Sequence, residues 1–222
     1  MLENIFSESV SILAELLKKR MKVYGIDFLY ISQESLMTFL YVISLISRNP
    51  EIVDRVFIEY PFEEVEPRET DPSEEETGPR EKFDIFIDVD PKYYVEVKYV
   101  RPFPSKRNLP LPRLRGSLIN DIVRITCETK KIREAGKYLL LIASDEFINH
   151  ISKKPGFPLN GKPWRGKINE LIVVGTEKNE ISNKYKEFDE YRECLSQEVE
   201  LHLIRHEVVD PLHIVLWKVT TP

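Results

Sequence analysis

The chain has 222 residues, 42% of them hydrophobic and 31% charged, with a formal net charge of −5. This composition is typical of a globular chain with one sizeable core, and the acidic balance argues against a protein that coats nucleic acid with its whole surface. No apolar run reaches the ~18–20 residues of a membrane-spanning helix, and no basic, Ala-rich signal segment opens the chain. We therefore expect a cytoplasmic protein with no membrane partner. Cys127 and Cys194 are expected to be free thiols.

The first quarter of the chain predicts two helices and a strand. Residues 7–21 carry apolar side chains at helical spacing and end in Lys18-Lys19-Arg20, which suits a helix C-terminus. Residues 32–47 are apolar nearly all round, as expected of a buried helix. Residues 53–60 then predict a strand.

Residues 61–81 interrupt this order. From Glu59 to Glu81 there are ten Asp or Glu residues against two Lys or Arg, with four prolines and no sustained apolar periodicity. We expect an acidic, flexible loop, whose simplest interpretation is a solvated insertion.

Residues 83–100 predict a hairpin, because two runs of β-branched and aromatic residues flank Asp90-Pro91-Lys92, a turn sequence. The two-residue period of a strand puts Glu96 and Lys98 on one face. The first run places Asp84 and Asp88 on one face, so the hairpin would bring one or two aspartates towards the same pair. Two nearby carboxylates suit a hard cation such as Mg²⁺, and a lysine beside them can orient or deprotonate an attacking water.

After the hairpin the charge reverses, with ten Lys or Arg against two acidic residues between Lys98 and Arg133. Four prolines between Arg101 and Arg115 indicate an extended connection without regular structure. Such a basic segment suits a phosphate backbone, although a solvated linker remains the alternative.

The rest of the chain predicts alternating helices and strands. A helix is expected over 117–135, with Asp121, Arg124 and Glu128 on one face, followed by a buried strand over 138–144. Further on we expect a short helix at 145–152, a basic loop at 153–167, a strand at 171–175, a polar helix at 180–196, and strands at 199–208 and 212–219 that extend the central sheet.

The hairpin carries a resemblance to a known family. D-I-F-I at 84–87, followed by V-E-V-K at 95–98, resembles the motif of the PD-(D/E)xK nuclease superfamily, with Phe83 where the name-giving proline would stand. The resemblance implies that Asp84 and Glu96 are metal ligands, that Lys98 is catalytic, and that Glu34 from the first core helix joins them. The expected element order over residues 32–144 agrees with the αβββαβ core of that family.

The resemblance therefore implies an α/β, restriction-endonuclease-like fold with a mixed central sheet flanked by helices. We expect one domain over residues 1–222, with its core at 32–144, an N-terminal helix at 7–21 and a strand/helix extension at 145–222. The implied function is a Mg²⁺- or Mn²⁺-dependent hydrolase, a DNA endonuclease. The basic residues expected on nucleic acid are Arg101, Lys106, Arg107, Arg113, Arg115 and Arg124.

Two alternatives stay open. The same fold also serves non-catalytic proteins that bind nucleic acid or assemble with partners. Glu96 and Lys98 could also be an exposed pair on an unrelated α/β domain. The sequence leaves a homodimer open as well.

Overall fold

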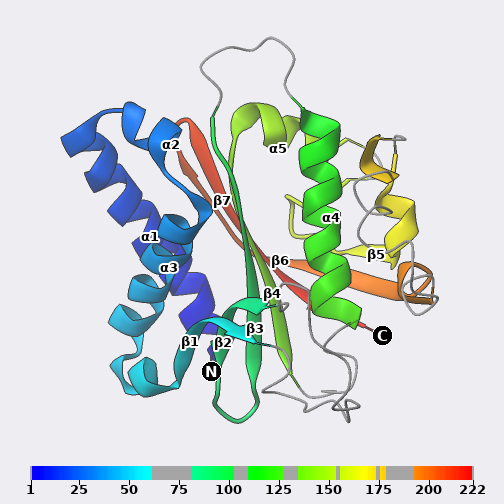
Figure 1. Cartoon of the computed structure of the whole chain (residues 1–222), viewed down its shortest axis with the longest axis horizontal. Coiled ribbons are helices and arrows are strands. Elements are labelled where there is room, and N and C mark those ends of the chain that lie inside the picture. Colours follow the sequence, from blue (N-terminus) through cyan, green and yellow to red (C-terminus); the bar gives the residue numbers. More distant parts are fainter. Residues whose placement is uncertain are drawn as a thin grey trace, which may run out of the picture.

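The computed structural model describes residues 2–61, 82–102, 110–127, 135–153, 156–173, 176–178 and 193–221. In these ranges the chain forms an α/β fold in which helices cover both faces of a seven-stranded mixed sheet (Figure 1). The strand order is β1-β2-β3-β4-β7-β6-β5. The strands are β1 (Val56–Pro61), β2 (Lys82–Ile87), β3 (Tyr93–Val100), β4 (Gly136–Ser144), β5 (Trp164–Lys167), β6 (Glu198–Val209) and β7 (Leu212–Thr220).

One pair of neighbouring strands in the sheet is parallel. β3 and β4 are parallel, whereas every other neighbouring pair is antiparallel. A parallel pair needs a long crossover, and helix α4 (Leu111–Cys127) lies in that connection. β6 and β7 form a long hairpin beside β4, which confirms the two final strands expected from the sequence and their addition to the central sheet.

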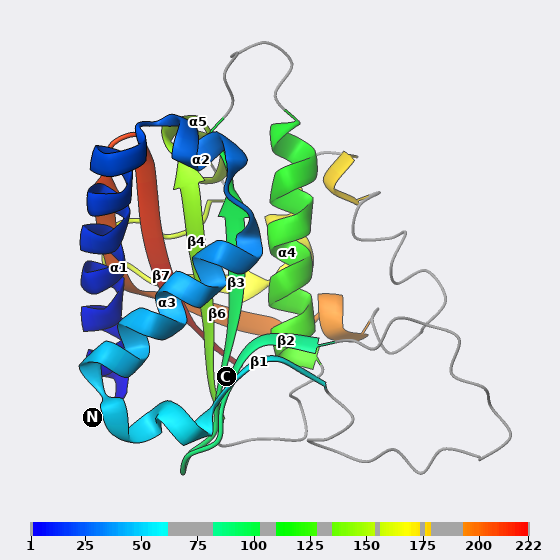
Figure 2. The same ribbon diagram turned by 60° about the vertical axis from the view of Figure 1, so that its left-hand side comes forward.

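Three helices, α1 (Leu2–Tyr24), α2 (Asp27–Ile31) and α3 (Glu34–Arg48), cover one face of the sheet (Figure 2). The apolar stripe of α1 is buried, with Leu13 and Leu17 fully covered, and each such side chain contributes about 1.5–3 kcal/mol by leaving water. This layer packs on the side chains of β2, β3 and β4 that point to its side. The expected helices are confirmed, but α2 was not expected.

Helix α4 covers the opposite face. Its inward residues Leu118, Ile119, Ile122 and Val123 are fully buried against a core that includes Trp217 of β7. The Trp217 indole donates its hydrogen bond to the carbonyl oxygen of Pro158 at 2.6 Å, so the polar group of this large buried side chain is satisfied.

Helix α4 begins earlier than the sequence predicted. It starts at Leu111, so Pro112 and the two arginines after it are helical and do not belong to an irregular connection. Proline is tolerated in the first turn because the N–H groups there have no intrahelical partner. Pro112 is therefore part of the first helical turn, and its interpretation as a helix breaker was wrong, whereas Pro102 and Pro110 lie outside regular structure as expected and Pro104 lies outside the described residues.

Smaller differences concern short elements. Residues Pro50–Arg55 form a 3₁₀ helix before β1, and Ile168–Leu171 form another, helix η3, where the expected strand at 171–175 begins. β5 lies inside the expected loop at 153–167. The short helix expected at 145–152 is confirmed as α5 (Asp145–Ile151). Residues 62–81 of the expected acidic loop and 180–192 of the expected polar helix lie outside the described residues.

Cys127 and Cys194 form a disulfide, so the prediction of free thiols was wrong. Cys127 ends α4, Cys194 precedes β6, and their Cα atoms lie 5.9 Å apart although 67 residues separate them in the chain. The bond ties the crossover helix to the C-terminal extension.

None of the helices within the described ranges combines the length and the apolar character that crossing a membrane requires.

The disulfide predicts a redox-dependent stability. Cys194→Ser should lower the free energy of unfolding of the oxidised protein by roughly 2–4 kcal/mol, since the cross-link no longer restricts the unfolded chain. Urea denaturation of wild type and variant, each with and without dithiothreitol, measures this. The reductant should lower wild type to the level of the variant and leave the variant unchanged. A wild-type curve that does not respond to the reductant would contradict the assignment.

Candidate active site

The site forms where β2 leaves β3. The two strands pair at Ile85–Val95, Phe86–Tyr94 and Ile87–Tyr93, and β2 then curves away (Figure 2). The backbone N–H groups of Val97 and Tyr99 point to the vacated side. Buried backbone donors need acceptors, so this edge of β3 requires partners other than a strand.

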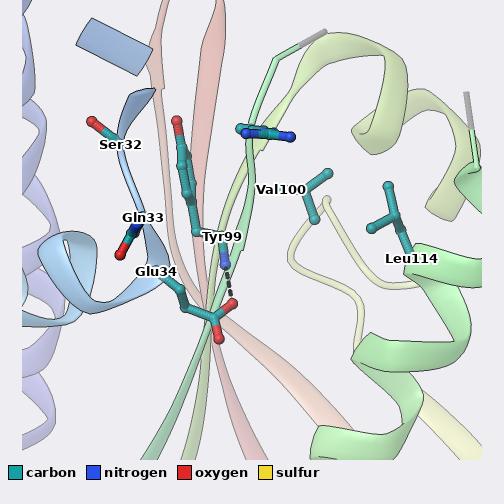
Figure 3. Close-up of a pocket in the computed structure, with 7 residues that line it drawn as sticks. Ser32, Gln33, Glu34, Tyr99, Val100 and Leu114 are labelled. Carbon is teal, nitrogen blue, oxygen red and sulfur yellow. Dashed lines mark hydrogen bonds between the residues drawn. The ribbon is translucent and has the colours of Figure 1, made fainter. Parts of the chain in front are cut away.

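Two carboxylates supply those partners. The Val97 N–H donates to Asp84 Oδ2 at 2.7 Å. The Tyr99 N–H donates to Glu34 Oε2 at 3.0 Å (Figure 3). Asp84 belongs to β2 and Glu34 to the first turn of α3. The β3 backbone therefore fixes both side chains along its edge, and both were predicted as site residues.

Glu96 and Lys98 point to the α4 side of the sheet, as do their alternate neighbours Tyr94 and Val100, which lie in the core beneath α4. Helix α4 meets them with Asp121 and Arg124. The geometry thus confirms that one strand face carries Glu96 and Lys98 together.

The six side chains form an alternating charged cluster, which we define as Glu34, Asp84, Glu96, Lys98, Asp121 and Arg124. Lys98 Nζ lies 3.2 Å from Asp121 Oδ2 and 3.3 Å from Glu34 Oε2. Arg124 Nη2 lies 3.4 Å from Asp121 Oδ1 and is bonded to Glu96 Oε2. Each cation therefore bridges two carboxylates.

Burial dominates the electrostatics of the cluster. Glu96 is 0% and Asp121 6% exposed. Burial, reinforced by the Asp84 charge, raises the pKa of Glu96 well above its usual value. Burial also raises the pKa of Asp121 to about 6, although Lys98 and Arg124 oppose the change. Burial alone would lower the pKa of Lys98, but Asp121 and Glu34 outweigh it and raise that pKa, so Lys98 stays an ammonium.

The cluster fits a divalent cation by its donors and its charge. Four carboxylates against two cations leave a formal charge of −2, and Glu96 Oε1 is a buried oxygen that faces no hydrogen-bond donor among the described residues. Carboxylate oxygens are the ligands that Mg²⁺ and Mn²⁺ prefer. In the conformation described, Lys98 and Arg124 lie between the carboxylates, and no three acidic, His or Cys side chains of the described ranges converge as a formed metal site.

Sequence reasoning missed Asp121 as a site residue. Its position three residues before Arg124 on the polar face of an expected helix was the available signal, but the sequence did not show that this face would dock over Glu96. Arg124, predicted to bind nucleic acid, lies within the cluster.

The other basic residues that were predicted to bind nucleic acid differ in their exposure to solvent. Arg101, just beyond the end of β3, and Arg113 in α4 are exposed. Arg115 is only 2% exposed, and its Nη1 lies 3.3 Å from Glu177 Oε1, which differs from the exposed position that a nucleic-acid contact requires. The early start of α4 turns Arg115 inward. Lys106 and Arg107 lie outside the described residues.

A cavity of about 400 Å³ adjoins the cluster. It lies at the carboxyl end of β3, between the first turns of α3 and α4 (Figure 3). The Tyr99 hydroxyl donates to the Leu29 carbonyl oxygen at 2.6 Å, which fixes the tyrosine at its wall. The lining residues are Ser32, Gln33, Glu34, Tyr99, Val100, Arg101 and Leu114. Glu34 belongs to both cavity and cluster, so a ligand in the cavity would lie next to Lys98.

Comparisons of the chain with protein-family models, with curated proteins and with solved structures found no match.

The raised pKa of Asp121 predicts a pH-dependent stability in metal-free buffer. Because its folded pKa of about 6 exceeds the unfolded value, the folded state favours the protonated carboxyl, and this contribution is lost as the pH rises from about 4 through 6. Relative to Asp121→Asn, wild type should lose up to about 3 kcal/mol over that window. Urea denaturation at several pH values measures the difference. Asp54→Asn, at an exposed position, is the control, and a wild-type-minus-variant difference that stays flat would contradict the prediction.

Proposed function

We propose that this protein is a metal-dependent nuclease that hydrolyses phosphodiester bonds, with DNA as the expected substrate. The observation that carries the proposal is that Asp84, bonded to the Val97 N–H where β2 leaves β3, interacts with Glu96, and that Lys98 lies two residues further along the same strand face. Acidic ligands beside a lysine in a partly exposed site suit phosphoryl chemistry.

The arrangement of elements supports the proposal. From α3 through β1, β2, β3 and α4 to β4, the order is helix, three antiparallel strands, helix and a strand parallel to the third. This order agrees with the αβββαβ core expected of the restriction-endonuclease-like fold, which the motif also implies, and so supports the proposal.

In this function Asp84 and Glu96 would hold Mg²⁺ or Mn²⁺, which when bound offsets negative charge on the phosphate. Lys98, kept protonated by Asp121 and Glu34, would orient the attacking water and offset charge on a phosphate oxygen, and it would not act as a base. Hydrolysis adds water across one P–O bond and leaves a phosphomonoester and a free hydroxyl. Glu34, on the cavity side, would position the lysine.

The cavity gives the substrate strand a place next to the reacting phosphate. Its volume lies within the range of small-molecule sites, and it offers an aromatic wall, apolar side chains and an exposed arginine at one end. We assign it to the nucleotide beside the scissile phosphate, with Arg101 on the adjacent backbone.

A second candidate is a non-catalytic protein that binds nucleic acid or a partner through the same surface. The observation that favours it is the pairing of all four carboxylates with Lys98, Arg124 or backbone N–H groups, which makes the cluster self-sufficient without a metal.

Cleavage of labelled linear, branched and single-stranded DNA and RNA in Mg²⁺, Mn²⁺ or EDTA separates the two candidates. Wild type should cleave in metal only, and Lys98→Met should lower the rate by about 10²–10⁴-fold, because a positioned charge is lost from the reaction. Lys92→Met is the matched control, since Lys92 pairs with Asp88 outside the cluster. Unaltered turnover in Lys98→Met would reject the role of the lysine, and wild-type cleavage in EDTA would reject the metal dependence. No cleavage by wild type would favour the non-catalytic candidate.

Binding of duplex DNA should depend on Arg101. Arg101→Gln should weaken binding to every sequence and reduce the slope of log K against log salt by about 0.9, the value for one lost phosphate contact. Fluorescence anisotropy in EDTA at several salt concentrations measures the slope. Lys92→Gln serves as the control. If Arg101→Gln and Lys92→Gln give the same slope, Arg101 does not contact the nucleic acid.

A further inference from the structure

Arg124 uses only part of the hydrogen-bonding capacity of its guanidinium. Its contacts to Glu96 Oε2 and Asp121 Oδ1 both come from the single nitrogen Nη2. Its Nε is buried and has no hydrogen-bond acceptor in the part of the chain that the structure describes. Strong arginine–carboxylate pairs use two parallel N–H groups, so this guanidinium is bound to Glu96 through one end only.

The charge that Arg124 carries favours the ionised form of Glu96, which burial otherwise disfavours by raising the pKa of that carboxyl. Glu96 is 0% exposed, and an ionised carboxylate at such a position needs a counter-charge. Lys98 cannot supply it alone, because its ammonium already contacts Asp121 and Glu34. Arg124 is therefore the cation that balances Glu96 in the structure described.

The position of Arg124 relative to solvent suits a replaceable group. Its side chain is 18% exposed, whereas that of Glu96 is fully covered. The arginine thus reaches from the carboxylate to the surface, with a long side chain that can adopt other rotamers.

We propose that Arg124 is an exchangeable counter-ion. It neutralises Glu96 in the metal-free protein, gives up that carboxylate to a divalent cation, and presents its guanidinium to a phosphate of the bound nucleic acid. The metal and the substrate in this inference rest on the proposed function. The exchange itself concerns residues of this chain and can be measured without nucleic acid.

If the Arg124–Glu96 ion pair were permanent, the expected effect of removing Arg124 on metal affinity would be the opposite. If Arg124 stayed on Glu96 when the cation bound, its removal would take away a neighbour that helps to orient the ligand, and metal affinity would fall or stay the same. Competition between the guanidinium and the cation instead requires that removing the guanidinium strengthens metal binding.

Mn²⁺ titration of the protein alone, followed by calorimetry and by thermal melts, tests the exchange. Arg124→Gln should bind Mn²⁺ about tenfold more tightly than wild type, a factor typical of coupled sites. It should also melt at a lower temperature in EDTA and gain more on adding Mn²⁺. Arg124→Lys keeps the charge on a shorter, more mobile side chain and should give an intermediate affinity, so the test survives if Arg124→Gln does not fold. Arg20→Gln, an exposed change in α1, should behave like wild type.

The outcomes separate this inference from the proposed function. Mn²⁺ binding to wild type that Arg124→Gln and Arg124→Lys leave unchanged or weaken would overturn the exchange and leave the metal site standing. Mn²⁺ binding to none of the proteins would overturn both. Tighter Mn²⁺ binding by Arg124→Gln, together with loss of Mn²⁺ binding in Asp84→Asn, would support both the exchange and the metal site.

The phosphate contact has its own measurement. In a Lys98→Met background, which suppresses cleavage, Arg124→Gln should reduce the salt slope of duplex binding by about 0.9 in Mn²⁺ and leave it unchanged in EDTA. Equal slopes in Mn²⁺ would overturn the second half of the proposal.

Discussion

The unpaired edge of β3 sets the requirements for everything around it. Once β2 turns away, the N–H groups of Val97 and Tyr99 must find acceptors from side chains, and Asp84 and Glu34 provide them. Because acceptors at these positions are carboxylates, negative charge accumulates beside Glu96. The departure of β2 therefore explains both why these backbone N–H groups need side-chain acceptors and why acidic groups gather here. Phosphoryl chemistry would use the same acidic groups.

The buried charges constrain one another in turn. Lys98 and Arg124 each lie between two carboxylates, and a buried charge without a partner is far more costly than one within a network. The cluster is thus a matched set held by three layers: α3, the sheet and α4. Docking of α4 is as important to the site as the E-x-K strand, because the helix brings both Asp121 and the counter-charge of Glu96.

Local patterns predicted much of the fold and part of the site. The two-residue period of 83–100 predicted the hairpin and the shared face of Glu96 and Lys98, and the apolar run at 138–144 predicted β4. The failures were of a different kind. The partners of Arg115 and Cys127 are Glu177 and Cys194, more than 60 residues away, and no local pattern contains them. The role of Asp121 depends on how α4 packs, and Pro112 was misread because its effect depends on its position within a helix turn.

The carboxylates along β3 also cover a strand edge that would otherwise be open to another chain. A strand edge with free N–H groups is a template for pairing with another chain. Here the edge is covered by negative groups, which would repel the same edge of a second molecule. An apolar residue in place of Asp84 would therefore do more than empty a site. It would uncover a backbone donor and remove the repulsion, so such a variant would be prone to intermolecular strand addition while its hydrophobic core stayed intact.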